Sequence, residues 1–196
     1  GTDALKIYEA IASVFSDDGV LVLMDLGSAV MNAEMAVEFL PEAHQEKVFL
    51  CEAPLVEGAI AAAVAAAIGK NIQQVMAEAR GALNAKAMQL GVSNLTAYSS
   101  NNTQPTTSAA YPTREIRLIV SNRLGLHARP TAQFVATAAK FQSRIHVQNL
   151  TRNTAVVRGD SINQVATLGV RQGHEVLITA AGVDADAALA ALQTLF

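Results

Sequence analysis

The chain has 196 residues, of which 51% are hydrophobic and 16% charged, so we expect folded domains rather than a disordered polypeptide. It has no apolar stretch long enough to predict a membrane span and no signal-peptide pattern. Its single cysteine, Cys51, cannot form an internal disulfide, which favours a reducing compartment. We therefore expect a cytoplasmic protein that has no membrane partner.

The first 90 residues alternate helical and strand patterns. Asp3 can cap a helix over residues 3–15, and an apolar run at 20–24 predicts a buried strand. A helix over 28–40, a second strand over 47–51 and helices over 56–68 and 71–90 follow in that order. Helices that alternate with apolar strands indicate an α/β domain with a parallel sheet. Two strands are few for such a sheet, so we expect a missing strand upstream of Gly1.

Residues 91–113 are rich in Ser, Thr, Asn and Pro and lack both hydrophobic periodicity and charge. This composition predicts a flexible linker between a domain at 1–90 and a domain at 114–196. The net charge is −7 before residue 91 and +4 after it. The opposite charges suggest domains that meet each other or their partners electrostatically, although chance variation of surface charge is an equal alternative. The basic half has no Lys/Arg run and few aromatic residues, so we expect no nucleic-acid partner.

The second domain follows the order β-α-β-β-α-β-α. We predict a strand at 115–120, a helix at 129–140, a hairpin of strands 144–150 and 153–157, a short helix from Ser161, a strand at 175–179 and a closing helix at 185–195. This order is typical of an α+β open-faced sandwich, in which an antiparallel sheet carries helices on one face.

The run Gly125-Leu126-His127-Ala128-Arg129-Pro130 places a histidine directly before a helix. The free backbone N–H groups of a first helical turn, including that of Ala128, form an anion site, and Arg129 can bind phosphate oxygens in bidentate fashion. A nucleophilic imidazole beside such a cradle is suited to a transient phosphohistidine. The alternative is a helix-capping or surface histidine.

The remaining histidines show no metal-ligand spacing with one another or with Cys51. We therefore expect neither a metal nor a cofactor. Asp25 follows the first predicted strand, at the edge where open α/β sheets bind ligands. From spacing alone, it could orient a histidine, bind a metal or cap the next helix.

Residues 114–196 closely resemble the HPr phosphocarrier family of the phosphoenolpyruvate-dependent phosphotransferase system. The resemblance rests on the run at 122–135 around His127 and on a second run at 161–169. It implies that His127 accepts a phosphoryl group from enzyme I on a ring nitrogen and that Arg129 contacts this group. It also implies that Ser161 is a regulatory kinase target in some members, although an ordinary N-cap is the favoured alternative.

This sequence departs from the HPr pattern on the faces that dock partners in that family. Ala136 and Ala139 are neutral where HPr proteins usually carry basic residues, and Asn163 and Gln164 are polar where a large apolar residue is usual nearby. These differences predict a specialised carrier with a different partner set.

Residues 1–90 resemble the mannose-type IIA domain, in the form found in the phosphotransferase subunit of bacterial phosphoenolpyruvate-dependent dihydroxyacetone kinase. The resemblance rests on the runs at 1–4, 22–29, 32–34 and 53–58. It implies that Asp25 faces an active histidine located upstream of Gly1, which would make this domain incomplete here. His44 follows Pro41 at the expected start of a strand and does not match that histidine.

Together, the two resemblances imply a phosphohistidine relay that carries phosphate from enzyme I through His127 toward the ADP-binding subunit of a dihydroxyacetone kinase. The mannose-type domain further implies a homodimer. The alternatives are a regulatory docking module, in which Ser161 would be the important residue, and the IIA component of a mannose-type sugar permease.

Overall fold

The computed structural model describes residues 2–89 and 111–196, which lie in two compact units, 1–83 and 84–196. Most of the predicted linker, 91–113, lies outside the described residues, and its described end at 111–113 is irregular. Within the described ranges, no helix is long and apolar enough to cross a membrane.

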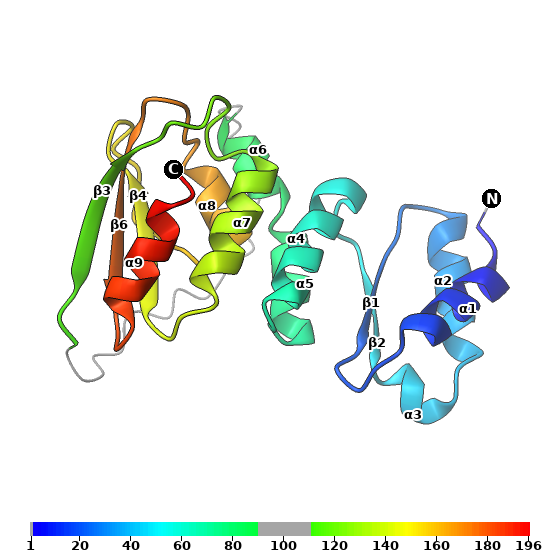
Figure 1. Cartoon of the computed structure of the whole chain (residues 1–196). Coiled ribbons are helices and arrows are strands. Elements are labelled where there is room, and N and C mark those ends of the chain that lie inside the picture. The colour runs from blue at the N-terminus through cyan, green and yellow to red at the C-terminus, as the bar shows by residue number, and fades with distance from the viewer. Residues whose placement is uncertain (1, 90–110) are drawn as a thin grey trace. The chain divides into compact units, whose positions relative to one another are not determined.

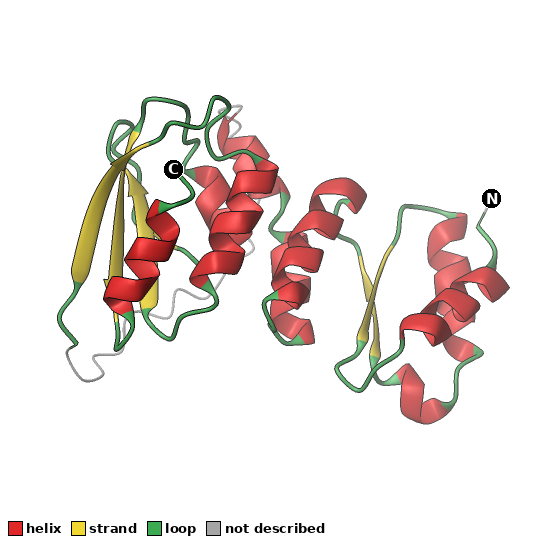
Figure 2. Ribbon diagram, in the orientation of Figure 1, coloured by secondary structure: helices red, strands yellow, loops and turns green. Residues whose placement is uncertain are grey.

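The first unit is a parallel two-stranded sheet with helices on both faces (Figures 1 and 2). Strands β1 (Val20–Leu23) and β2 (Val48–Cys51) pair from Val20 opposite Val48 to Leu23 opposite Cys51. Helices α1 (Ala4–Val14) and α2 (Ser28–Glu38) pack around Ile11, Ala36 and Leu40 on one face. Helices α4 (Leu55–Ala67) and α5 (Ile72–Arg80) pack around Ala65, Val75 and Ala79 on the other. The predicted α/β parallel arrangement is confirmed.

The predictions for residues 1–90 need two corrections. The single helix predicted over 71–90 is two helices, α5 and α6 (Leu83–Gln89), because Gly81 ends α5 as its C-cap and the chain turns there. His44 does not begin a strand. It lies in the short helix α3 (Glu42–Gln45), where Pro41 supplies the extended N-cap and the imidazole stacks on Phe15 with ring centroids 4.0 Å apart.

The second unit is an antiparallel sheet whose strands lie in the order β3-β6-β4-β5. Its strands are β3 (Arg114–Ile119), β4 (Arg144–Asn149), β5 (Val157–Arg158) and β6 (Glu175–Ala181). Its helices α7 (Ala128–Ala138), α8 (Ile162–Thr167) and α9 (Ala185–Gln193) cover one face of this sheet (Figure 2). Burial alternates along β6, whose Val176, Ile178 and Ala180 are fully buried. The open-faced α+β sandwich is confirmed.

The predicted hairpin turn at 151–152 is wrong, because β5 is short and residues 150–156 form a loop. Side chains next to the turn bond to the backbone in place of the strand ladder. The Asn149 side chain accepts the Arg152 N–H at 3.3 Å, and the Thr154 hydroxyl accepts the Asn149 N–H at 3.1 Å. Asn153 then adopts a positive φ of 48°, which reverses the chain.

Candidate functional site

The loop between β3 and α7 is held against the chain segment at 170–171. Gly125 has a φ of +69°, and a Cβ atom built on it would lie 2.1 Å from the Val170 carbonyl oxygen and 2.6 Å from the Arg171 Cα. The next residue, Leu126, donates its N–H to the same Val170 carbonyl at 3.1 Å. Only glycine permits both this conformation and this approach. The contact fixes the chain two residues before His127.

The C-terminal residues brace the same loop from another side. Asn122 donates its side-chain amide to the Leu195 carbonyl at 2.9 Å. Ser121 donates both its N–H, at 3.2 Å, and its hydroxyl to the Phe196 carbonyl. The Phe196 ring packs edge-on against Phe134, a fully buried residue of α7, with ring centroids 6.1 Å apart. The loop therefore has a defined shape without belonging to a helix or a strand.

His127 is the N-cap residue of α7, with φ −82° and ψ −176°, which confirms its predicted position directly before a helix. Its side chain is exposed and makes no capping hydrogen bond, so the helix-capping alternative does not describe it. Among residues 2–89 and 111–196, no group accepts the backbone N–H of Ala128 or Arg129, and Pro130 has none to offer. An exposed imidazole thus stands beside two open N–H donors at the positive end of an eleven-residue helix.

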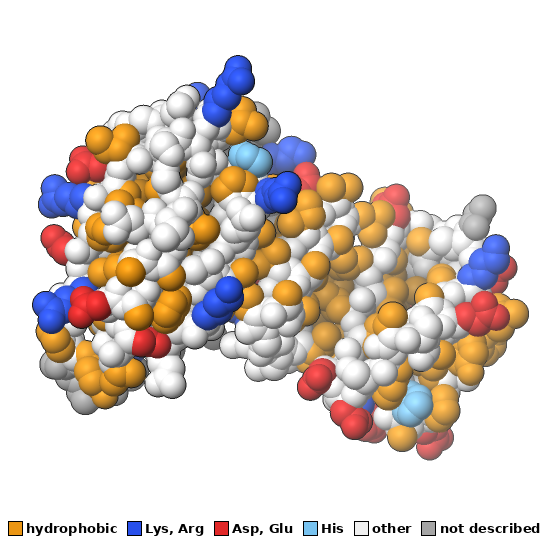
Figure 3. Space-filling view, in the orientation of Figure 1, with side chains coloured by type: hydrophobic (Ala, Val, Ile, Leu, Met, Phe, Trp, Pro, Cys, Tyr) orange, Lys and Arg blue, Asp and Glu red, His pale blue; other side chains and the backbone are white. Residues whose placement is uncertain are grey.

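Three arginines lie close to His127 in the sequence or in the segment that its loop contacts. They are Arg123, Arg129 and Arg171, all exposed, and none forms an ion pair within the described part of the chain. Figure 3 shows Lys and Arg side chains beside a histidine at the end of this unit where α7 begins. An anion at the start of α7 would meet helix N–H groups and guanidinium groups together.

Ser161 is buried, with 5% of its surface exposed, and is the N-cap of α8. Its hydroxyl accepts the Gln164 N–H at 3.3 Å, which confirms the capping interpretation. Next to it, Asp160 accepts two hydrogen bonds from the Arg158 guanidinium, at 2.9 Å and 2.5 Å. In this conformation the serine has a structural role.

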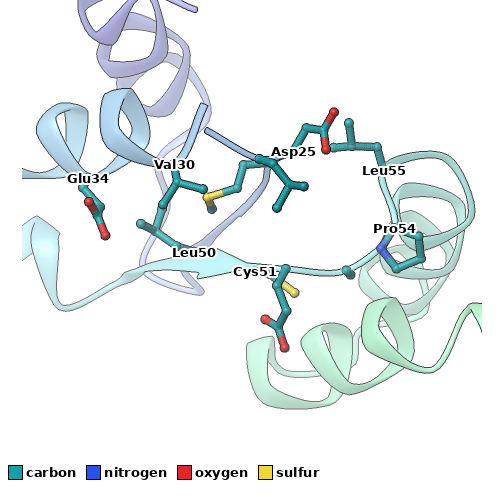
Figure 4. Close-up of a pocket in the computed structure, with 11 residues that line it drawn as sticks. Asp25, Val30, Glu34, Leu50, Cys51, Pro54 and Leu55 are labelled. Carbon is teal, nitrogen blue, oxygen red and sulfur yellow. The ribbon is translucent and has the colours of Figure 1, made fainter. Parts of the chain in front are cut away.

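Asp25 lies in the first unit at the rim of a pocket of about 350 Å³ (Figure 4). The pocket opens at the carboxyl ends of β1 and β2, the edge at which parallel sheets bind ligands. Figure 4 shows the Asp25 carboxylate near Leu55, with Glu34 at the opposite end of the pocket. The walls are mostly apolar, and three carboxylates line it, those of Asp25, Glu34 and Glu52.

Asp25 does not cap the helix that follows it. Gly27 is the N-cap of α2 and makes no side-chain bond, and no described group forms a hydrogen bond with the Asp25 carboxylate. Glu52, by contrast, accepts two hydrogen bonds from the Arg80 guanidinium, at 2.8 Å and 3.0 Å. The side-chain hydrogen bond from Arg80 lowers the pKa of Glu52. Within the described ranges, Asp25 is therefore an exposed carboxylate without a partner, at the edge of an apolar pocket.

Sequence patterns missed several parts of both sites. Val170 and the C-terminal residues contact the His127 loop only in the folded chain, and no local pattern indicates them. Glu52 could have been found, because it directly follows the second parallel strand as Asp25 follows the first. Glu34 lies on α2 and lines the pocket only because the fold brings α2 beside the strand ends, so no local pattern indicates it.

Comparison with known proteins gives matches to both units. Residues 114–196 match the family model PTS-HPr, described as "PTS HPr component phosphorylation site", and residues 1–76 match EIIA-man, described as "PTS system fructose IIA component". Two relatives, from Klebsiella michiganensis and Escherichia coli K12, are 42% identical over the whole chain. Both are phosphoryl donor subunits, DhaM, of a phosphoenolpyruvate-dependent dihydroxyacetone kinase. The chain spans about 40% of their length.

Among solved structures, an HPr from Thermoanaerobacter tengcongensis is 41% identical, with a TM-score of 0.39 over 42% of this chain and 89% of its own. A phosphocarrier protein HPr from Bacillus anthracis is 34% identical, with a TM-score of 0.40 over 42% of this chain and 95% of its own. The chain is thus similar over its whole length to DhaM subunits, with an HPr match at 114–196 and an EIIA-man match at 1–76.

Proposed function

We propose that this chain is a phosphohistidine relay, in which an HPr domain at 114–196 is joined through a linker at 91–113 to an EIIA-man domain at 1–90. The phosphoryl group would pass from phosphoenolpyruvate through enzyme I to His127, and onward to ADP held by a dihydroxyacetone kinase subunit. The observation that carries the proposal is the exposed, unbonded His127 imidazole at the open N-terminus of α7, within a match to the HPr phosphorylation-site model.

In the proposed transfer, a ring nitrogen of neutral His127 attacks the phosphorus atom of the donor. A nitrogen–phosphorus bond forms as the bond from phosphorus to the donor breaks, and the donor leaves with that electron pair. The three equatorial oxygens carry negative charge throughout. The N–H groups of Ala128 and Arg129 and the Arg129 guanidinium are the groups that would stabilise this charge, because they lie in the first turn after His127.

The apolar pocket beside Asp25 is the proposed site of the next transfer. Its position at the carboxyl ends of both strands and its exposed Asp25 carboxylate fit a site that holds and orients an imidazole. That imidazole would be the active histidine that the resemblance to the mannose-type IIA family implies. Asp25 would accept a ring N–H and so keep the other ring nitrogen free to take the phosphoryl group.

The charge of the two domains supports a direct encounter between them. Residues 1–90 carry a net charge of −7, and residues 114–196 carry a net charge of +4. Attraction between opposite charges raises the encounter rate, and a flexible linker holds the partners at an effective concentration of about millimolar. We further propose a homodimer formed through the EIIA-man domain and a cytoplasmic location.

Enzyme I, phosphoenolpyruvate and the purified chain provide the test. Intact-mass measurement is expected to show the addition of one acid-labile phosphoryl group, absent when enzyme I is omitted. Arg129→Lys retains the charge but loses the bidentate geometry, and we expect it to slow labelling by about 10-fold, which is less than the roughly 100- to 1,000-fold cost of removing such a contact altogether. A wild-type chain that gains no phosphoryl group under these conditions would overturn the proposal.

The alternative functions predict different partners. A regulatory docking module would act through Ser161, which is a buried helix cap in this structure, and a sugar permease would require membrane partners. Capture from a lysate with the immobilised chain is expected to retrieve a dihydroxyacetone kinase subunit. Retrieval of membrane permease components instead of a kinase subunit would indicate that the chain donates its phosphoryl group to a sugar-uptake system.

A further inference from the structure

Thr131 lies in the first turn of α7 and is buried, with 1% of its surface exposed. It has two hydrogen-bond donors, and both point back toward the site. Its N–H donates to the His127 carbonyl at 2.9 Å, and its hydroxyl donates to the Leu126 carbonyl at 2.9 Å. One residue therefore holds both carbonyls that flank His127.

The hydroxyl bond is not the ordinary back-bond of a helical threonine. In that pattern the hydroxyl bonds a carbonyl three or four residues earlier within the same helix. Here it reaches five residues back, past the N-cap, to a buried loop residue whose N–H is already held by Val170. A hydrogen bond from α7 thus holds the peptide group between Leu126 and His127. A hydrogen bond to the segment at 170–171 holds the N–H of Leu126.

A peptide group held in this way leaves its neighbour little freedom to rotate. The backbone direction from which the His127 side chain departs is set by the two flanking peptide planes. If the Leu126 carbonyl lost its donor, that plane could tilt toward another partner, and the exposed imidazole would move with it. A misplacement of about 1 Å can slow a reaction roughly 100-fold.

We propose that Thr131 is a positioning residue for His127, acting through the Leu126 carbonyl rather than by touching the transferred group. This inference rests on the proposed role of His127 as the phosphoryl acceptor. It differs from a purely structural role for the hydroxyl, which would affect the stability of the unit but not the reactivity of the folded protein.

The test compares three variants of the full chain. Thr131→Val keeps the shape and the N–H but removes the hydroxyl, whereas Thr131→Ser keeps the hydroxyl. Thr137→Val is the matched control, because Thr137 lies half-buried on the same helix and its hydroxyl bonds no group in the described ranges. Each variant is assayed at a temperature at which it is folded, for kcat/KM of labelling by enzyme I and for the backbone amide resonances of His127 and Ala128.

We expect Thr131→Val to lower kcat/KM by about 10- to 100-fold and to shift both amide resonances, since the perturbation is one of geometry. Thr131→Ser and Thr137→Val are expected to stay within about 3-fold of wild type, a difference of less than 1 kcal/mol in the barrier. A Thr131→Val chain that reacts at the wild-type rate, or a Thr131→Ser chain that reacts as slowly as Thr131→Val, would overturn the inference.

Failure of the proposed function gives a separate result. If the wild-type chain takes no phosphoryl group, the relay is refuted and the amide resonances alone decide the role of Thr131. Resonances of His127 that move in Thr131→Val and return in Thr131→Ser then support positioning. Resonances that stay in place in both variants refute it.

Discussion

Replacing Gly125 with alanine tests whether the His127 loop packs against the segment at 170–171 in solution. The new methyl group would lie 2.1 Å from the Val170 carbonyl oxygen and 2.6 Å from the Arg171 Cα, both of which belong to the backbone and cannot rotate away. Either the loop moves outward or the 170–171 segment does. In both cases the hydrogen bond from Leu126 to Val170 is lost or distorted.

The expected cost has two parts. Alanine at a φ of +69° is strained by about 1–2 kcal/mol, and forcing a methyl group into a filled space costs about 1–3 kcal/mol more. Gly173→Ala is the matched control, because Gly173 has a φ of +81° in the neighbouring turn but no atom within 4 Å of the place that the methyl group would occupy. The control therefore includes the strain, and also the lower entropy of the unfolded chain, without the clash.

The assay is urea unfolding of the full chain, followed through NMR resonances of buried residues such as Phe134 and Ile178, which report on the second unit alone. Gly125→Ala is expected to lower the free energy of unfolding by about 1–3 kcal/mol more than Gly173→Ala does. For a unit of this size, such a difference lowers Tm by roughly 5–20 °C. Equal destabilisation by the two variants would refute the packing of the loop on residues 170–171.

Three further predictions concern stability. Asn149→Ala removes a fully buried amide that donates to a backbone carbonyl and contacts a histidine ring nitrogen, and urea unfolding is expected to show a loss of about 2 kcal/mol; an unchanged midpoint would contradict it. The hydrogen bond from the Ser143 hydroxyl lowers the pKa of Asp184, so the folded chain binds fewer protons there than the unfolded chain does. The stabilisation is therefore present at pH values above 3.8, the ordinary pKa of an aspartate, and it declines as the pH falls through the lowered pKa of Asp184. Asp184→Asn should lower Tm at neutral pH but not at the acid end of the titration; a pH-independent difference would count against the charge effect. Lys70→Met removes the ammonium group that contacts the Glu78 carboxylate at 2.9 Å and should destabilise the first unit by about 3 kcal/mol. In a double-mutant cycle, the Lys70→Met, Glu78→Leu variant should regain most of the lost stability.

The sequence was most informative where a local rule determines the structure. The His-Ala-Arg-Pro run predicts a histidine directly before a helix, since Pro130 suits only the first turn, and His127 is indeed the N-cap of α7. Ser161 was expected to cap a helix for the same kind of reason, and it does. Both positions depend on residues within a few places of each other, which is why the pattern alone sufficed.

Long-range contacts and side chains that bond to the backbone limited the prediction. The tight hairpin turn predicted at 151–152 is replaced by a loop at 150–156, because Asn149 is fully buried and its side chain bonds to the segments around it. The brace on the His127 loop from Phe196 joins residues 75 apart in the chain, which no local pattern reveals. The pocket beside Asp25 likewise forms only where two parallel strands end together.

The most direct test of the central claim is to locate the phosphoryl group on the protein. After incubation with phosphoenolpyruvate and enzyme I, a phosphorus–nitrogen correlation in the NMR spectrum should connect a phosphoramidate resonance to the imidazole ring of His127. The same treatment of His127→Gln should give no phosphoramidate signal while the fold of the unit is retained. A phosphoramidate on another histidine, or a label that persists in His127→Gln, would contradict the account.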